Sequence, residues 1–176
     1  VEKPAPGTAP TNLINAGTYV LEPSVLDRIA PDVPVNVERV TFPAMVADGA
    51  LYAFDGGSYW IDAGIPSTYL RANLDLLDGT SGTEDGVHPT ASTDGEVVGS
   101  WIGAGAHVAE GASVIGSVVL PGARIGPRSV IRGSILGERS EIGADVVLGD
   151  DVVVGDEGVV PSGAELSCER VVGASS

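Results

Sequence analysis

The sequence predicts two regions of different fold class, one after the other along the chain. Residues 1–79 favour an α/β segment, residues 80–96 a linker, and residues 97–176 a triangular β-solenoid. Three observations support this division. Aliphatic residues recur every six positions in the second half, small polar residues dominate the stretch before it, and the first half mixes β-type and helical spacings.

The six-residue repeat is the strongest of these signals. A branched aliphatic residue occupies twelve positions, with two one-residue slips: Ile102, Val108, Val114, Leu120, Ile125, Ile131, Leu136, Ile142, Leu148, Val154, Val160 and Leu166. Glycine and alanine concentrate directly after these positions, as a tight corner requires. Each hexad predicts one short strand and one corner, so three hexads make a coil and the whole repeat makes about four coils. The aliphatic residues should point inward and stack about 4.8 Å apart.

The first half alternates shorter elements. Residues 18–21 are β-branched and aromatic, and residues 51–64 suggest two short strands around an Asp-Gly-Gly turn. Residues 24–29 and 37–48 have helical spacing, the second interrupted at Pro43 and ended by Gly49. Residues 66–77 predict a helix with Tyr69, Leu70, Leu74 and Leu77 on one face.

Charge and composition exclude several classes of protein. The net charge of −15 repels nucleic acids and anionic membranes, so neither is expected as a partner. No apolar run approaches the length of a membrane span, no signal peptide is visible, and Cys168 is the only cysteine. These features predict a cytoplasmic protein. Lys3 is the only lysine, which suggests a position where a compact ammonium charge is needed.

Four short motifs occur in order ahead of the repeat: "VEKP", "NAG", a glutamate before "TFP", and "YWIDAG". This series resembles the second half of the sugar-1-phosphate nucleotidyltransferases, and most of all the mannose-1-phosphate guanylyltransferases (GDP-mannose pyrophosphorylases). The resemblance implies the C-terminal part of a Rossmann-like catalytic domain followed by a left-handed parallel β-helix of hexapeptide repeats. The family's glycine-rich phosphate loop does not occur in these residues. The chain is therefore expected to be the C-terminal half of an enzyme and to be inactive alone.

The resemblance also implies roles for individual residues. Glu2 would accept hydrogen bonds from sugar hydroxyls, and Lys3 would hold the sugar phosphate. Asn15 and Gly17 would line the sugar pocket, where a glycine lets the backbone approach the ring. Asp62 would bind Mg²⁺ together with an aspartate from the absent half. Lys3 and Asp62 are thus the candidate catalytic residues.

Three further residues match the motifs in supporting places. Trp60 and Gly64 would hold the turn that directs the carboxylate of "YWIDAG", and Glu38 would be structural or lie on the sugar side. The family often has Gly-Thr-Pro after the aspartate, whereas this sequence has Gly64-Ile65-Pro66. A hydroxyl group is therefore not expected to act at that place, and the role of Asp62 is unchanged.

The implied reaction joins a sugar 1-phosphate to a nucleoside triphosphate and releases pyrophosphate. Two polyanions must meet in line, so the catalyst supplies position and positive charge. A lysine offsets one phosphate, and Mg²⁺ held by hard carboxylate ligands offsets the other. Mannose 1-phosphate and GTP are the expected substrates, with thymidylyl or uridylyl transfer to glucose 1-phosphate as the alternative.

Two other readings stay open. The β-helix belongs equally to non-catalytic assembly or regulatory subunits and to hexapeptide-repeat acyltransferases, whose catalytic histidine lies at a subunit boundary. Of the two histidines, His88 falls in the linker and His107 is expected at a solvent-exposed corner. Apolar residues beside the inward ladder predict a homo-oligomer formed through the β-helix. These residues are Val118, Val119, Val146, Val147, Val152, Val153 and Val159.

Overall fold

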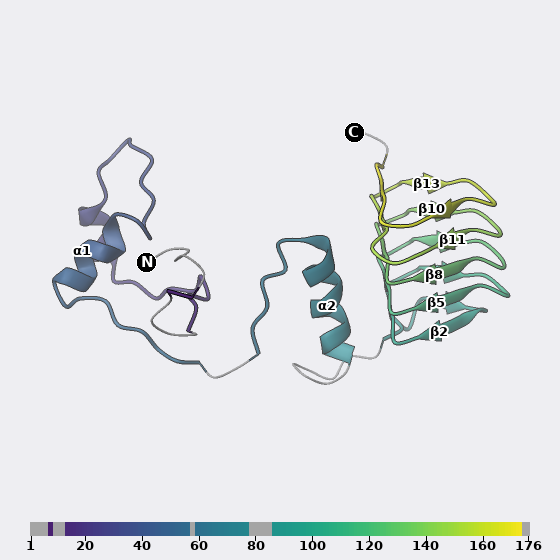
Figure 1. Ribbon diagram of the computed structural model, residues 1–176, viewed down its shortest axis with the longest axis horizontal. Helices are drawn as coiled ribbons and strands as arrows, with labels where there is room; N and C mark the ends of the chain where they lie inside the picture. The colour runs from purple at the N-terminus through teal and green to yellow at the C-terminus, as the bar shows by residue number, and fades with distance from the viewer. Residues whose placement is uncertain (1–6, 9–12, 57–58, 78–85, 174–176) are drawn as a thin grey trace. The chain divides into compact units, whose positions relative to one another are not determined.

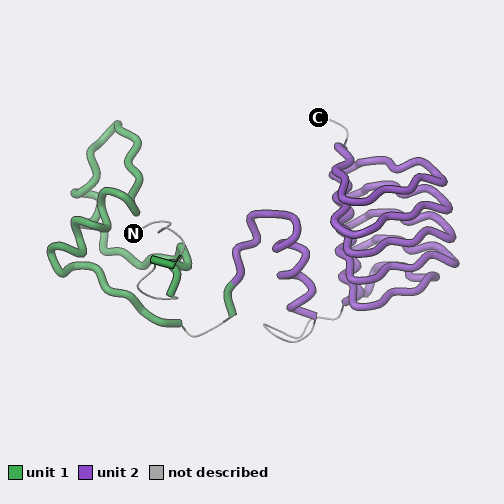
Figure 2. Tube along the Cα trace, viewed as in Figure 1, with its two compact units in different colours: residues 1–60 green, residues 61–176 purple. Residues whose placement is uncertain are grey.

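The computed structural model describes residues 7–8, 13–56, 59–77 and 86–173, and it divides the chain into two compact units (Figures 1 and 2). The first unit is Val1–Trp60 and the second is Ile61–Ser176. The boundary between the two units, after Trp60, thus comes before residue 79, which was the expected end of the first segment. Helix α2, Pro66–Leu77, accounts for the difference, because it packs with the β-helix that follows it.

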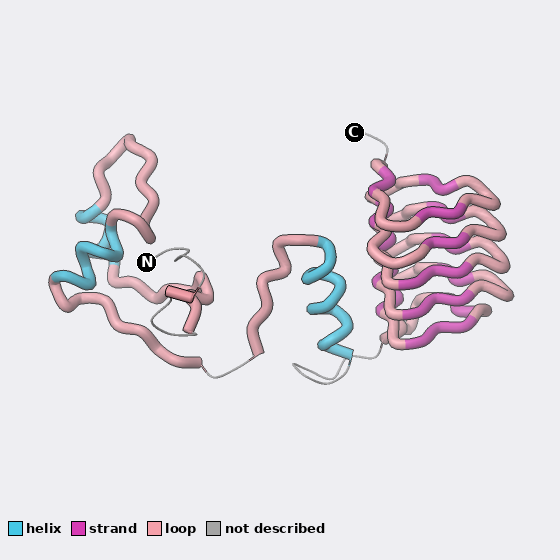
Figure 3. The backbone as a smooth tube through the Cα atoms, in the orientation of Figure 1, coloured by secondary structure: helices cyan, strands magenta, loops and turns pink. Residues whose placement is uncertain are grey.

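The first unit contains two short helices and little regular structure besides (Figure 3). The 3₁₀-helix η1 spans Pro23–Arg28, and helix α1 spans Thr41–Ala47. Pro43 was expected to interrupt the second helix, but it lies in the first turn of α1, where its missing N–H costs no intrahelical bond. Gly49 follows the helix with a φ of 67°, as expected for a glycine that ends a helix.

The strands expected at residues 18–21 and around residues 51–64 do not form among the residues that the structure describes. A strand needs a neighbour to satisfy its backbone groups, and no described segment lies alongside these stretches as one. Three of their apolar side chains are almost fully exposed instead: Val20 is 99% exposed, Tyr52 87% and Phe54 93%. The β-type pattern is therefore present without the sheet that would use it.

The second unit is a parallel β-helix of about five coils, with five strands in each of three sheets. One sheet has the order β1-β4-β7-β10-β13, the second β14-β11-β8-β5-β2, and the third β15-β12-β9-β6-β3. The strands are β1 (Ser92–Thr93), β2 (Glu96–Val98), β3 (Trp101–Ile102), β4 (His107–Val108), β5 (Ser113–Ile115), β6 (Val118–Val119), β7 (Arg124–Ile125), β8 (Val130–Arg132), β9 (Ile135–Leu136), β10 (Glu141–Ile142), β11 (Val147–Leu148), β12 (Val153–Val154), β13 (Val159–Val160), β14 (Glu165–Leu166) and β15 (Arg170–Val171). The expected left-handed β-helix of hexapeptide repeats is confirmed.

The first coil begins earlier than the sequence suggested. Strand β1 pairs with β4, and Val87 forms a bridge with Ile102, so residues expected in the linker already belong to the solenoid. The additional coil raises the count from about four to about five.

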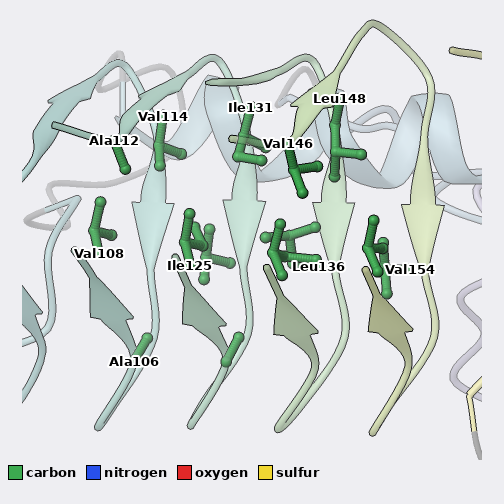
Figure 4. Close-up of a cluster of buried hydrophobic side chains, with 14 of the residues drawn as sticks. Ala106, Val108, Ala112, Val114, Ile125, Ile131, Leu136, Val146, Leu148 and Val154 are labelled. Atoms are coloured by element: carbon green, nitrogen blue, oxygen red, sulfur yellow. The ribbon is translucent and has the colours of Figure 1, made fainter. Parts of the chain in front are cut away.

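The inward ladder follows the hexad spacing with one correction. Ile102, Val119 and Leu136 are paired across β3, β6 and β9, so Val119 points inward where Leu120 was expected. Val119 is fully buried and Leu120 only half-buried. The cause is the Gly116-Ser117 corner, which closes that side of the triangle in five residues rather than six. Figure 4 shows the ladder, with Val114, Ile131 and Leu148 stacked along the axis.

Serine hydroxyls satisfy the backbone at the short corners. The Ser117 N–H donates to Ser100 Oγ at 3.0 Å, and the Ser134 N–H donates to Ser117 Oγ at 3.1 Å. These serines are buried, so each hydroxyl replaces the water that would otherwise bind the corner. Outside, the corners carry ion pairs: Arg128 donates to both carboxylate oxygens of Asp145, at 2.7 and 2.6 Å, and lowers the pKa of that carboxyl.

Most of the valines expected on the surface are buried. Val118, Val119, Val146 and Val152 are all 0% exposed. Val119 points into the ladder, Val146 and Val152 belong to the same core cluster, and Val118 points outward beneath α2. Of the other three, Val147 is 37% exposed, Val159 is 60% exposed and Val153 is half-buried.

Gly126→Ala should lower the melting temperature of the chain. A Cβ at Gly126 would come within 2.6 Å of the Gly143 carbonyl carbon, a backbone atom of the next coil that cannot move alone. Gly149→Ala is the matched control, because its Cβ would meet first the Ser167 hydroxyl, at 3.2 Å. Thermal unfolding followed by circular dichroism compares them. Equal melting temperatures would contradict the role of coil-to-coil contact in selecting glycine here.

Candidate functional site

Asn15 and Glu38, 23 residues apart in the sequence, meet in the first unit. Asn15 Nδ2 donates to Glu38 Oε1 at 3.2 Å and to the Tyr19 hydroxyl at 2.6 Å. The Tyr19 hydroxyl in turn donates to the same Glu38 oxygen. The structure thus brings together two residues that the sequence singled out, and it adds a third.

Tyr19 is the site residue that sequence analysis missed, because its β-type neighbours suggested a strand. Its ring packs edge-on against Phe42, with centroids 4.8 Å apart, which ties the cluster to the small core of Val25, Phe42 and Met45. Donation to Glu38 raises the pKa of the Tyr19 phenol, since loss of the proton would break that bond. The hydrogen bond with Asn15 lowers the pKa of Tyr19, while burial and the negative charge of Glu38 raise it by smaller amounts.

The "NAG" segment forms a turn closed by its own asparagine. The Gly17 N–H donates to Asn15 Oδ1 at 2.9 Å, and Gly17 has a φ of 70° that favours glycine. No described atom lies within 4 Å of where a Gly17 Cβ would be, so that side of the backbone is open. Trp60 Nε1 donates to the Ala16 carbonyl at 3.3 Å, and therefore braces this turn rather than the one after Asp62.

Asp62 lies in the second unit as an exposed carboxylate just ahead of α2. Its Oδ1 accepts a hydrogen bond from the Gly64 N–H at 2.9 Å, which makes a local turn of the Asx type. Gly64 holds this turn as expected. Asp62 belongs to a different unit from Asn15, Gly17, Trp60 and Glu38. Glu2 and Lys3 lie outside the described residues.

The described residues do not form a complete metal site. Among them, no group of three or more histidine, cysteine, aspartate or glutamate side chains could hold an ion. One exposed carboxylate still fits Mg²⁺, which is commonly bound by one or two carboxylates plus substrate phosphates and water. Asp62 is suited to be one ligand among several.

The histidines occupy different places from those expected. His107 lies in β4 on the outer face of its sheet rather than at a corner, 4.0 Å from an Asp94 oxygen. It lines a shallow groove of about 500 Å³ with Arg124 and Glu141. His88 Nδ1 accepts from the Thr90 N–H at 3.2 Å, in a turn of the first coil. The same His88 nitrogen also lies 3.0 Å from the Thr90 hydroxyl, two residues along this turn.

Two protein-family models together match nearly the whole chain. Residues 84–174 match the family model described as the GMPPB C-terminal domain, and residues 1–79 match the model described as nucleotidyl transferase. The chain belongs to the GMPPB C-terminal domain family. The resemblance to the sugar-1-phosphate nucleotidyltransferases is confirmed. Within the described ranges, no helix of this family member is long and apolar enough to cross a membrane.

Individual relatives agree with this family. Mannose-1-phosphate guanylyltransferase from Mycobacterium tuberculosis is 39% identical over 139 residues, which cover 76% of this chain and 37% of that protein. Mannose-1-phosphate guanyltransferase from Schizosaccharomyces pombe is 51% identical over 70 residues, covering 40% of this chain and 18% of that protein. The chain thus spans well under half the length of these relatives.

Among solved structures, the chain is similar to a hexapeptide transferase family protein from Anaplasma phagocytophilum. The sequence identity is 18% and the TM-score 0.36, over 49% of this chain and 69% of that one.

Proposed function

We propose that the chain is part of a nucleotidyltransferase that joins mannose 1-phosphate to GTP, releasing pyrophosphate and forming GDP-mannose. One observation carries the proposal: a nucleotidyl transferase segment and a GMPPB C-terminal domain follow each other in a single chain. The relatives named for mannose-1-phosphate guanylyl transfer support the choice of sugar and base. The reaction takes place in the cytoplasm in this proposal.

The sugar phosphate binds on the side of the first unit. Lys3 holds the phosphate as a compact positive charge, and Glu2 accepts hydrogen bonds from the sugar hydroxyls. Gly17 presents the open side of its backbone to the ring, and Asn15 shapes that turn through its bond to the Gly17 N–H. Both amide hydrogen bonds of Asn15 go to Tyr19 and Glu38, so the residue acts by holding the turn.

Asp62 is the proposed carboxylate ligand of Mg²⁺ in this chain. The ion would offset charge on the phosphates as they are brought together. Because Oδ1 already accepts the Gly64 N–H, the turn fixes the direction of the carboxylate before any ion binds. Substrate phosphates and residues beyond this chain complete the coordination in this proposal, since the described residues offer no cluster of ligands.

The first unit carries apolar side chains that no part of this chain covers among the described residues. Val20, Tyr52 and Phe54 are at least 87% exposed, and they lie in the stretches with a strand-like pattern. Large uncovered apolar surfaces mark places where another segment packs. We infer that the remainder of the nucleotidyltransferase domain covers them.

Homo-oligomerisation through the β-helix remains a proposal. It now rests on Val147 and Val159, the two of the seven valines that are clearly exposed. Glu141 lies beside Val159 on the outer face of the same sheet, and Arg124 lies beside Glu141, which limits the apolar area available to a partner.

The whole protein, including any sequence beyond these residues, should release pyrophosphate from GTP when mannose 1-phosphate is present. The 176-residue chain should release none, because it lacks a glycine-rich phosphate loop. A coupled pyrophosphate assay measures both. The same assay with dTTP or UTP and glucose 1-phosphate tests the alternative specificity. Faster release with either of these pairs would overturn the assignment to GDP-mannose, and release by the isolated chain would overturn the need for a further segment.

A further inference from the structure

We propose that the β-helix positions Asp62 through helix α2, with Val118 as the positioning residue at the centre of the contact. This inference rests on the proposed function, because it concerns the carboxylate assigned there to Mg²⁺. The β-helix in this view is part of the metal site's support as well as an attached assembly domain.

Two of the three outer faces of the β-helix differ in polarity. On the sheet containing β4 and β7, the outward column reads His107, Arg124, Glu141 and Val159. On the sheet containing β3, β6 and β9, the corresponding column begins Trp101, Val118 and Ile135. Val118 is 0% exposed and Ile135 8%, although both point away from the ladder. An outward residue can be so deeply buried only when something covers that face.

Helix α2 is the covering element. It contacts β3 and β6 within the second unit, and Figure 1 shows it alongside the β-helix. The end of the helix is also held, because the Leu77 methyl groups lie 3.5 and 3.7 Å from where a Cβ on Gly86 would be. The predicted apolar face of α2, with Tyr69, Leu70 and Leu74, is half-buried. The contact is therefore a hydrophobic interface between α2 and the first coils.

The other end of α2 leads directly to Asp62. The Ile65 carbonyl accepts the Tyr69 N–H at 2.9 Å and the Thr68 hydroxyl at 3.1 Å, which begins the helix. One residue earlier, the Gly64 N–H binds Asp62 Oδ1, and a Cβ on Gly64 would come within 3.0 Å of that oxygen. Few free torsions separate the carboxylate from the helix. A shift of α2 on the β-helix must therefore move Asp62.

A metal site requires its ligands to be held within a few tenths of an ångström, which depends on the packing behind them. Val118 supplies such packing, although it lies far from Asp62 along the chain. Val118 touches neither the metal nor the substrate in this proposal, so its effect should appear in metal affinity and in the stability of α2 docking.

The test compares Val118→Ala with Val130→Ala in the whole protein. Val130 points outward from β8, on a different sheet from the β3 and β6 strands that α2 packs against, and it is half-buried. Loss of two methyl groups under α2 should raise the hydrogen-exchange rate of the α2 amides about tenfold, while the β-helix amides stay protected. Val130→Ala should leave α2 exchange unchanged.

Metal affinity is measured by titration with Mn²⁺ in place of Mg²⁺, with GTP present, following the electron paramagnetic resonance signal of free Mn²⁺. Val118→Ala should weaken Mn²⁺ binding roughly 10-fold, the lower end of the range seen when a metal ligand loses its support, and Val130→Ala should not. Unchanged α2 exchange, or faster exchange with unchanged Mn²⁺ affinity, would overturn the inference. Asp62→Asn in the same titration separates the two proposals, because no effect there would refute the metal ligand itself.

Discussion

Asp62→Asn should reduce turnover of the whole protein about a thousandfold at a fixed Mg²⁺ concentration. Loss of metal charge stabilisation is worth several kcal/mol, and each 1.36 kcal/mol corresponds to about a factor of ten in rate. Asparagine keeps an oxygen that can accept the Gly64 N–H, so the turn should persist while the charge is lost. Pyrophosphate release measured across a range of Mg²⁺ concentrations gives both the rate and the metal requirement.

Asp27→Asn provides the control for this prediction. Asp27 is an exposed carboxylate on η1, so its neutralisation changes the net charge equally without touching the proposed ligand. Its Mg²⁺ dependence should match that of the parent. A metal titration of Asp62→Asn that overlays the parent's would show that Asp62 serves only its turn.

Leu148→Ala should lower the free energy of unfolding of the β-helix by about 2–5 kcal/mol, the range for truncating a buried leucine to alanine. Leu148 is 0% exposed and lies in the inward ladder between Ile131 and Leu166. The cavity would weaken the contact with both neighbouring coils, and a solenoid is stabilised by such contacts between adjacent repeats. Urea unfolding followed by circular dichroism measures the change.

Val147→Ala is the matched control, one residue away in β11 and pointing outward. Val147 is 37% exposed, so truncating it leaves no enclosed cavity and should cost far less. If the two variants unfold at the same urea concentration, the inward ladder is not the main source of stability.

The hexad repeat was readable from sequence because one aliphatic residue per six positions has a single consistent explanation. Ile125, Ile131 and Leu148 point inward as the spacing requires. The spacing failed at residues 118–120, where three apolar residues follow one another. Either Val119 or Leu120 satisfies the pattern there, and the pairing of Val119 with Ile102 and Leu136 decides between them.

The candidate site was predicted unevenly. The motifs singled out Asn15, Gly17, Glu38 and Asp62, but the bond between Asn15 and Glu38 joins residues far apart in sequence. Tyr19 went unnoticed because a tyrosine among β-branched residues resembles a strand residue. Its hydroxyl group hydrogen-bonds both Asn15 and Glu38, and only the folded loop places it there.

The sequence by itself determined the local periodicities: the hexad repeat of the β-helix and the apolar face of α2. Periodicity reports which side chains share a face, because it depends only on the rise and rotation of the chain from one residue to the next. The tertiary structure alone decided what covers each face. Val118 and Val147 look alike in sequence, yet α2 packs over the sheet of the first and leaves the second exposed, because the partner of a surface is chosen by long-range contact.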